Sequence, residues 1–248
     1  WLLAHLYEPF SDDNSSGVVA ALEAAGVLRR MIAAGELPAP RFTLRVVLAA
    51  ECYGFAAYAA TRGGYLRDQT LGAMNLDGLP MEAGEATVWL APPGAAFFGD
   101  YLLRTLFREY QGQADPVLFR LQDAGHYADD QFLSDPTTGL PTVWPIGGRT
   151  LWHNSAEDMR LIHPKRFTRM TALAATWAGR ILGLEGDRLR AAVEEAAGHA
   201  RQLLAEEASG VLARLDAADP AGRARLRPWA AEALDRRFER EAGRLADF

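Results

Sequence analysis

Two patterns of apolar positions alternate along most of the chain. Short, almost continuously apolar runs are typical of strands buried within a sheet, and longer segments with apolar residues three and four positions apart are typical of helices packed on it. The expected strands are residues 1–6, 43–50, 71–76, 87–90 and 142–146, and the expected helices are residues 17–34, 54–61, 99–110 and 165–184.

The alternation of strands and helices predicts an α/β fold in which helices cover both faces of one sheet. We therefore expect a three-layer αβα sandwich with a mostly parallel, mixed sheet over residues 1–184. Residues 111–141 show little periodicity and are expected to be rich in loops. Residues 185–248 are rich in Ala, Glu, Arg and Leu at helical spacing and predict a C-terminal helical extension. That extension could pack on the core domain or serve self-association, and the pattern leaves both open.

Composition narrows the class of protein further. The chain has 248 residues, is 49% hydrophobic and carries a formal net charge of −6, which argues against a general affinity for nucleic acid or an anionic membrane. The single cysteine, Cys52, excludes an intrachain disulfide and fits a reducing compartment, so we expect a cytoplasmic protein. Residues 1–5 read as the middle of a strand, and we expect an upstream segment to precede them.

Several polar side chains stand where the apolar runs end or in the loops that follow them. In open α/β sheets this edge is where ligands bind. Two imidazoles and several carboxylates that converge there would suit a borderline metal such as zinc. The candidate residues are His5, Asp13, Glu51, Cys52, Asp77 and His153.

Each candidate also has an ordinary structural interpretation. Asp13 could cap the following helix, Asp77 with Gly78 is a common turn pair, and Cys52 alone is more often a small buried hydrophobic residue. Because all of the candidates stand at equivalent strand ends, we favour a shared site.

The same residues lie in motifs that follow one another in a familiar order. They are His5-Leu6-Tyr7, Asp13-Asn14-Ser15-Ser16-Gly17, Glu51-Cys52-Tyr53-Gly54, Asn75-Leu76-Asp77, Asp129-Asp130 ahead of Gly139-Leu140-Pro141, and His153-Asn154-Ser155-Ala156-Glu157-Asp158. Over roughly residues 1–184 this order resembles the co-catalytic zinc exopeptidases, which include bacterial leucyl aminopeptidases and glutamate carboxypeptidase. The His-x-x-x-Pro of residues 5–9 resembles a branch of bacterial aminopeptidases in particular.

The resemblance implies a role for each residue. Asp13 would bridge two metal ions, and His5 and Asp77 would complete one site. His153 and the residue after Glu51 would complete the other, and Glu51 would be the general base that takes a proton from water. The implied protein is a metal-dependent hydrolase with one or two zinc ions. It would be an aminopeptidase acting on a peptide or aminoacyl substrate.

Two positions depart from the family pattern. Cys52 stands where the family has a second Glu, and Tyr7 stands where it has an Asp. The shorter side chain of Cys52 has less reach than Glu, which favours a packing role over a ligand role. Glu8, Asp129 or Asp130 could then fill the gap.

Two further interpretations stay open. A catalytically inactive peptidase-like domain could serve binding or assembly, including assembly into a homo-oligomer through the helical tail. A single-metal acyltransferase on the same fold is conceivable but has no positive support. Retention of Glu51 favours the hydrolase, and loss of the second Glu favours the inactive domain.

Overall fold

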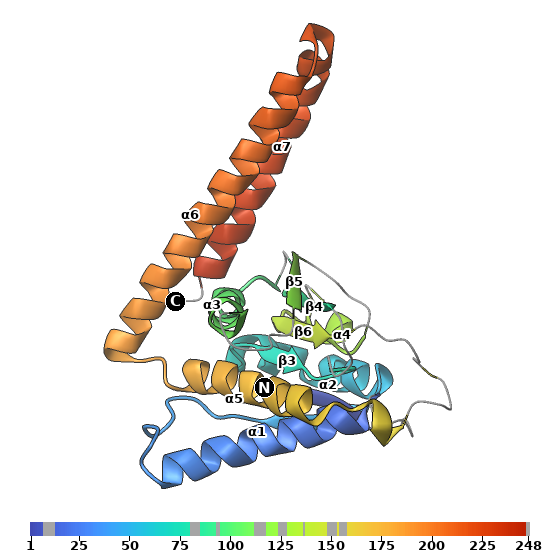
Figure 1. Ribbon diagram of the computed structural model, residues 1–248, viewed down its shortest axis with the longest axis vertical. Coiled ribbons are helices and arrows are strands. Elements are labelled where there is room, and N and C mark those ends of the chain that lie inside the picture. Colours follow the sequence, from blue (N-terminus) through green and yellow to red (C-terminus); the bar gives the residue numbers. More distant parts are fainter. Residues whose placement is uncertain are drawn as a thin grey trace.

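A six-stranded sheet forms the centre of the protein, with strand order β2-β1-β3-β6-β4-β5 (Figure 1). The computed structural model describes residues 1–6, 13–79, 85–92, 95–111, 118–123, 128–135, 137–147, 153 and 158–246. The strands are β1 (Leu2–Leu6), β2 (Val46–Ala50), β3 (Ala73–Asn75), β4 (Glu85–Leu90), β5 (Leu118–Asp123) and β6 (Thr142–Ile146).

Strand direction divides the sheet into two parts. β1, β2, β3 and β6 run parallel to one another, so their carboxyl ends share one edge. β4 and β5 run parallel to each other but opposite to the rest, because β4 pairs antiparallel with β6. The prediction of a mostly parallel, mixed sheet is confirmed.

Helices cover both faces of this sheet. They are α1 (Ser15–Ala33), α2 (Tyr53–Gln69), α3 (Gly99–Gln111), α4 (Asp130–Leu133), α5 (Pro164–Leu182), α6 (Gly186–Ala217) and α7 (Pro220–Leu245), with a 3-10 turn at Met159–Leu161. Successive strand residues face opposite helix layers. Leu2 and Met74 pack with α1, α3 and α5, whereas Leu3 and Ala73 pack with α2 and α4. These two cores give the three layers that the apolar pattern predicted.

Some expectations need correction at the edges of the sheet. Residues 43–50 were expected to be covered on both faces, but β2 is an edge strand and its residues are only partly buried. The segment 111–141, expected to be mostly loop, contains β5 and α4. β5 was not predicted because, as an edge strand, it has polar residues among its apolar ones. These are Arg120, Gln122 and Asp123.

The expected helix at 54–61 continues to Gln69. Its second half carries Gly63 and Gly64 and several exposed polar residues, so the sequence offers little apolar periodicity there. Leu66 is nevertheless fully buried and packs with Phe55 in the same core, which holds the added turns on the sheet.

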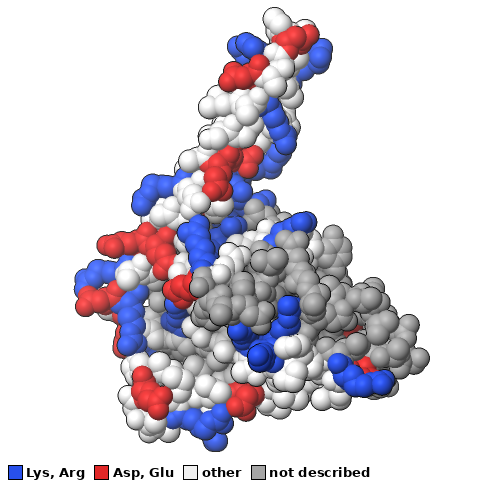
Figure 2. Space-filling model, viewed as in Figure 1, with Lys and Arg blue, Asp and Glu red and all other residues white. Residues whose placement is uncertain are grey.

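The C-terminal residues form a long antiparallel hairpin of α6 and α7 that projects from the domain (Figure 1). It packs on α3 through a small cluster of Tyr101, Ala196, Ala200 and Leu203. On the face shown in Figure 2, basic and acidic side chains intermingle along the hairpin. None of the described helices has both the length and the apolar character needed to cross a bilayer. The division of the chain at residue 184 stays a prediction.

Candidate metal centre

His5 lies near the end of β1, in the middle of the edge where four parallel strands end. Its Nε2 is 3.1 Å from Asp13 Oδ1 and 3.4 Å from Asp77 Oδ1. All three residues are buried, and their ligand atoms lie within 4.8 Å of one another. One imidazole and two carboxylates from separate segments therefore meet at one point.

The other oxygen of Asp13 faces a second histidine. His153 Nε2 is 3.2 Å from Asp13 Oδ2, and the His153 side chain is 44% exposed. Asp13 thus stands between two imidazoles, one buried and one open to solvent. The structure brings together four of the six sequence-predicted residues in this way.

The start of α1 brings Asp13 to this position. The cap of α1 is Asn14, whose Oδ1 accepts from the Gly17 backbone N–H at 3.1 Å, so the alternative role of Asp13 as a helix cap is wrong. A Cβ on Gly17 would lie 1.7 Å from the Leu76 carbonyl oxygen. Only glycine therefore allows α1 to begin directly against the end of β3, and this close approach sets Asp13 beside Asp77.

The charges at this centre are out of balance. Burial by itself would lower the pKa of His5, but the adjacent carboxylates of Asp13 and Asp77, with a contribution from Asp129, raise it to about 10. Despite the short distances, neither ring nitrogen of His5 makes a hydrogen bond of acceptable geometry with any described residue. Burying carboxylates without enough compensating charge is costly. A bound cation would supply that charge, and imidazole nitrogen with carboxylate oxygen is a donor set that fits zinc.

Glu51 and Cys52 follow β2 at the same edge, because Ala50 pairs in register with Leu6 of β1. Glu51 is half-buried. Cys52 begins α2, and its thiol does not join the group of potential metal ligands found among the described residues. The role of Cys52 stays a prediction.

Asp129 is the residue whose position the sequence did not predict. It is fully buried, and its Oδ1 accepts a hydrogen bond from the Cys52 backbone N–H at 2.7 Å. Burial raises the pKa of Asp129 to about 7, with help from Asp77 and Glu51 and against the effects of the Cys52 N–H and His5. The sequence proposed Asp129 only as a reserve ligand, since nothing in its local pattern indicates a bond to the Cys52 backbone. Tyr7 and Glu8 lie outside the described residues, as does the side chain of Asp130.

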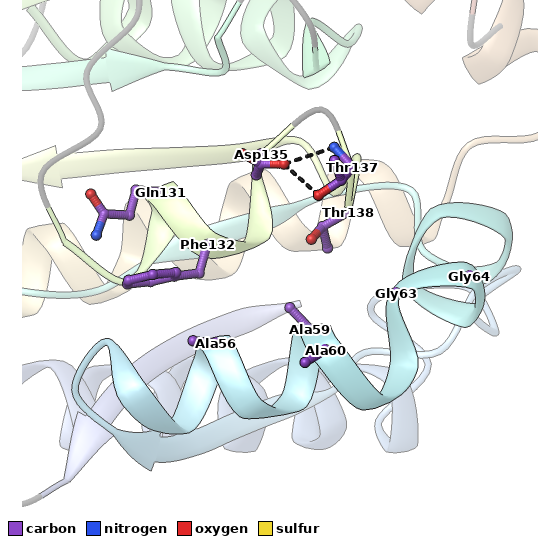
Figure 3. Close-up of a pocket in the computed structure, with 10 residues that line it drawn as sticks. All are labelled: Ala56, Ala59, Ala60, Gly63, Gly64, Gln131, Phe132, Asp135, Thr137 and Thr138. Carbon is purple, nitrogen blue, oxygen red and sulfur yellow. Dashed lines mark hydrogen bonds between the residues drawn. The ribbon is translucent and has the colours of Figure 1, made fainter.

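A groove in the described part of the protein has none of the metal-centre residues in its lining. Its volume is about 960 Å³, and it lies between α2 and the segment around α4 (Figure 3). The lining residues are Ala56, Ala59, Ala60, Gly63, Gly64, Gln131, Phe132, Asp135, Thr137 and Thr138. Its carboxylate, on Asp135, is engaged by the N–H of Thr137 at 2.8 Å. The reactive side chains are therefore in the buried cluster and not in the groove.

A twisted α/β sheet with a His and Asp cluster at its parallel carboxyl edge is the architecture expected of a co-catalytic metallopeptidase. Comparison with known proteins gives the family. The chain belongs to peptidase family M28, whose model matches residues 7–178. No curated protein sequence gives a significant match.

Solved structures share the fold at low sequence identity. A provisionally assigned peptidase from Clostridium acetobutylicum is 16% identical, with a TM-score of 0.59 over 73% of this chain and 40% of that one. The LapA aminopeptidase of Legionella pneumophila is 15% identical, with a TM-score of 0.53 over 74% of this chain and 51% of that one. A second LapA structure is 16% identical, with a TM-score of 0.51 and coverage of 71% and 51%. The chain thus spans about half or less of the length of these proteins.

Proposed function

We propose that the protein is a zinc-dependent aminopeptidase that removes N-terminal residues from peptides. The observation that carries this proposal is the Asp13 carboxylate, which has His5 on one oxygen at 3.1 Å and His153 on the other at 3.2 Å. Such a carboxylate is suited to bridge two metal ions. Membership of peptidase family M28 supports hydrolysis of a peptide bond.

In this proposal the two ion positions differ in their protein ligands. His5, Asp77 and one oxygen of Asp13 would hold the first ion, and His153 and the other oxygen of Asp13 would contribute to the second. Because Cys52 stands at the remaining ligand position, the second ion would have fewer protein ligands and would bind more weakly. Bound zinc lowers the pKa of water towards neutrality and polarises a carbonyl group.

Glu51 is the general base of the proposed reaction. Its carboxylate accepts a proton from the attacking water and delivers it to the amine that leaves. The LapA structures, which share this fold, are of an aminopeptidase. This likeness, together with membership of peptidase family M28, is why we propose an aminopeptidase and not an endopeptidase.

The test combines metal analysis with a substrate panel. Metal per chain is measured in the purified protein by mass spectrometry, and aminoacyl amides are assayed with a free and with an acetylated α-amine. We expect hydrolysis of the free amines only. Glu51→Gln should retain the metal and lose about a hundred- to ten-thousandfold in turnover. Glu36→Gln, a matched change at an exposed site, should change neither.

Two results would redirect the proposal. An active Glu51→Gln variant would place the general base elsewhere. Metal-loaded protein that hydrolyses nothing in the panel would favour the alternative function, a peptidase-like domain that binds its partner without cleavage. Cys52 at the second ligand position is the feature that supports this alternative.

A further inference from the structure

The turn from β2 into α2 has an unusual backbone conformation. Cys52 has φ 50° and ψ −60°, and the Tyr53 N–H donates to the Glu51 carbonyl across it. A three-residue turn with these dihedral angles is the positive-φ form of the γ-turn, which is rare and strained for a residue with a side chain. Strained conformations persist only where the surrounding structure holds them, and they cluster at functional sites.

A carboxylate 77 residues further along the chain holds this turn. The Cys52 N–H donates to Asp129 Oδ1 at 2.7 Å, a short bond to a fully buried, potentially charged acceptor. That N–H and the Glu51 carbonyl belong to the same peptide group. The group is therefore held at both ends, its N–H by Asp129 and its carbonyl by Tyr53.

Close packing also fixes the helix side of the turn. A Cβ on Gly54 would lie 2.9 Å from Ala49 Cβ, so the start of α2 is packed directly against the end of β2. The first helical bond runs from the Ala56 N–H to the Cys52 carbonyl at 2.8 Å. Glu51 therefore lies in the tight turn between β2 and α2. A rotation of the Glu51–Cys52 peptide group would change the direction of the Glu51 side chain.

The geometry points to Asp129 as a positioning residue, whose carboxylate clamps the Glu51–Cys52 peptide and so aims the Glu51 carboxylate at the metal centre. This inference rests on the proposed role of Glu51 as the general base. Asp129 Oδ2 is buried without a hydrogen-bond partner among the described residues. The clamp uses only one acceptor oxygen, so an amide in its place preserves the clamp and removes the charge.

The first measurement is independent of hydrolysis. Hydrogen exchange at the Cys52 amide, resolved by fragmentation mass spectrometry, should show protection in the wild type and in Asp129→Asn. In Asp129→Ala the protection should be lost. Asp135→Ala, which removes an exposed carboxylate that accepts from the Thr137 N–H, should leave the Cys52 amide protected.

The second measurement is the kinetic effect on aminoacyl amides. Asp129→Ala should lower kcat about ten- to a hundredfold, with KM and metal content nearly unchanged, because a small misplacement of a catalytic group affects the reacting geometry and not binding. Asp129→Asn should recover most of that loss. If Asp129→Ala folds poorly, Cys52→Gly in the same background should restore folding, since glycine adopts a positive φ without strain.

The outcomes separate this inference from the proposed function. A Cys52 amide that stays protected in Asp129→Ala would overturn the clamp. An Asp129→Asn variant that keeps the protection but is as slow as Asp129→Ala would overturn it too, because charge and not position would then matter. If the wild type hydrolyses nothing, the proposed function fails, yet amide exchange still decides whether Asp129 holds the turn.

Discussion

Two clusters of buried charge lie at opposite edges of the same sheet. The metal centre lies at the carboxyl ends of the parallel strands. The second cluster, here named the anchor cluster, consists of Asp100, Tyr101, Glu241 and Arg244 and joins α7 to the start of α3. Asp100 accepts from the Ala91 N–H just after β4, and because β4 runs against β1 and β3, this cluster lies at the far edge.

In the anchor cluster both carboxylates bond directly to arginine, and Glu241 accepts from Arg237 as well as from Arg244. Arg244 donates through Nε to Asp100 Oδ2 at 2.7 Å and through Nη1 to Glu241 Oε1 at 2.8 Å. The Tyr101 hydroxyl donates to Glu241 Oε2 at 2.6 Å. Among the described residues the metal centre has no comparable arginine, and the imidazoles of His5 and His153 lie against its carboxylates. Buried charge that is paired within the chain serves the fold, whereas buried charge left short of cations is suited to binding an ion.

The largest effect that would test this contrast is expected at Arg244. Arg244→Met leaves Asp100 buried without the arginine bonded to it and leaves Glu241 with Arg237, and breaking a buried pair in this way costs about 3–5 kcal/mol. Urea unfolding measures the loss. Arg225→Met, at an exposed position of the same helix, should change stability little. A cost for Arg244→Met as small as that of the control would show that the anchor cluster does not hold the hairpin.

The next effect is the response to metal. An ion bound at a hundred times its Kd adds about 2.7 kcal/mol to the free energy of unfolding. We expect zinc to raise the Tm of the wild type by a corresponding amount and to have little effect on Asp13→Asn, which loses the carboxylate between the two imidazoles. Arg244→Met should keep the full response because its cluster binds no ion. An equal zinc-induced rise in Tm for the wild type and Asp13→Asn would contradict the proposed metal centre.

A further effect is expected from pH at the joint between α3 and α6. Burial lowers the pKa of His199 to about 4, with Arg108 and Arg104 adding to the shift. Between pH 6.5 and 4 the unfolded chain therefore binds more protons at this residue than the folded protein does. Stability should fall with decreasing pH across this window by at most about 1.4 kcal/mol per pH unit.

The measurement is urea unfolding at several pH values, with His199→Gln as the comparison. The variant lacks the titrating ring, so its stability should depend less on pH between 6.5 and 4 than that of the wild type. Parallel pH profiles for the two proteins would contradict the assignment.

The smallest effect is expected at Asp77 in the metal-free protein. In the metal-free protein the carboxylates of the centre repel one another, and Asp77→Asn removes one of them. The free energy of unfolding should therefore change by less than about 1 kcal/mol, even though Asp77 is buried. Zinc affinity, measured by calorimetry, should fall clearly. Asp100→Asn should cost more stability, because Arg244 loses a partner. If Asp77→Asn lowered the free energy of unfolding more than Asp100→Asn does, the contrast between the two clusters would be wrong.

Sequence reasoning was most successful where one physical rule applies locally. The apolar alternation of β1 separates Leu2 from Leu3, and the structure puts these residues in different cores. It was least successful at edge strands, where β5 mixes polar and apolar residues. The same limit applies to α7, in which Glu241 and Arg244 look like solvent-exposed positions but are buried against α3.

At the metal centre the sequence determined the kind of chemistry, and the tertiary structure decided the geometry. Histidine and aspartate at strand ends indicate a metal site, because parallel strands present those ends at one edge. The pairing of Asp13 with both His5 and His153 depends on how closely α1 meets β3, which the sequence signals only through Gly17. The bond from Cys52 to Asp129 has no local signal at all, since a contact across 77 residues leaves no periodicity in the chain. Local patterns arise from neighbours along the backbone, whereas the positions of these side chains arise from packing between distant segments.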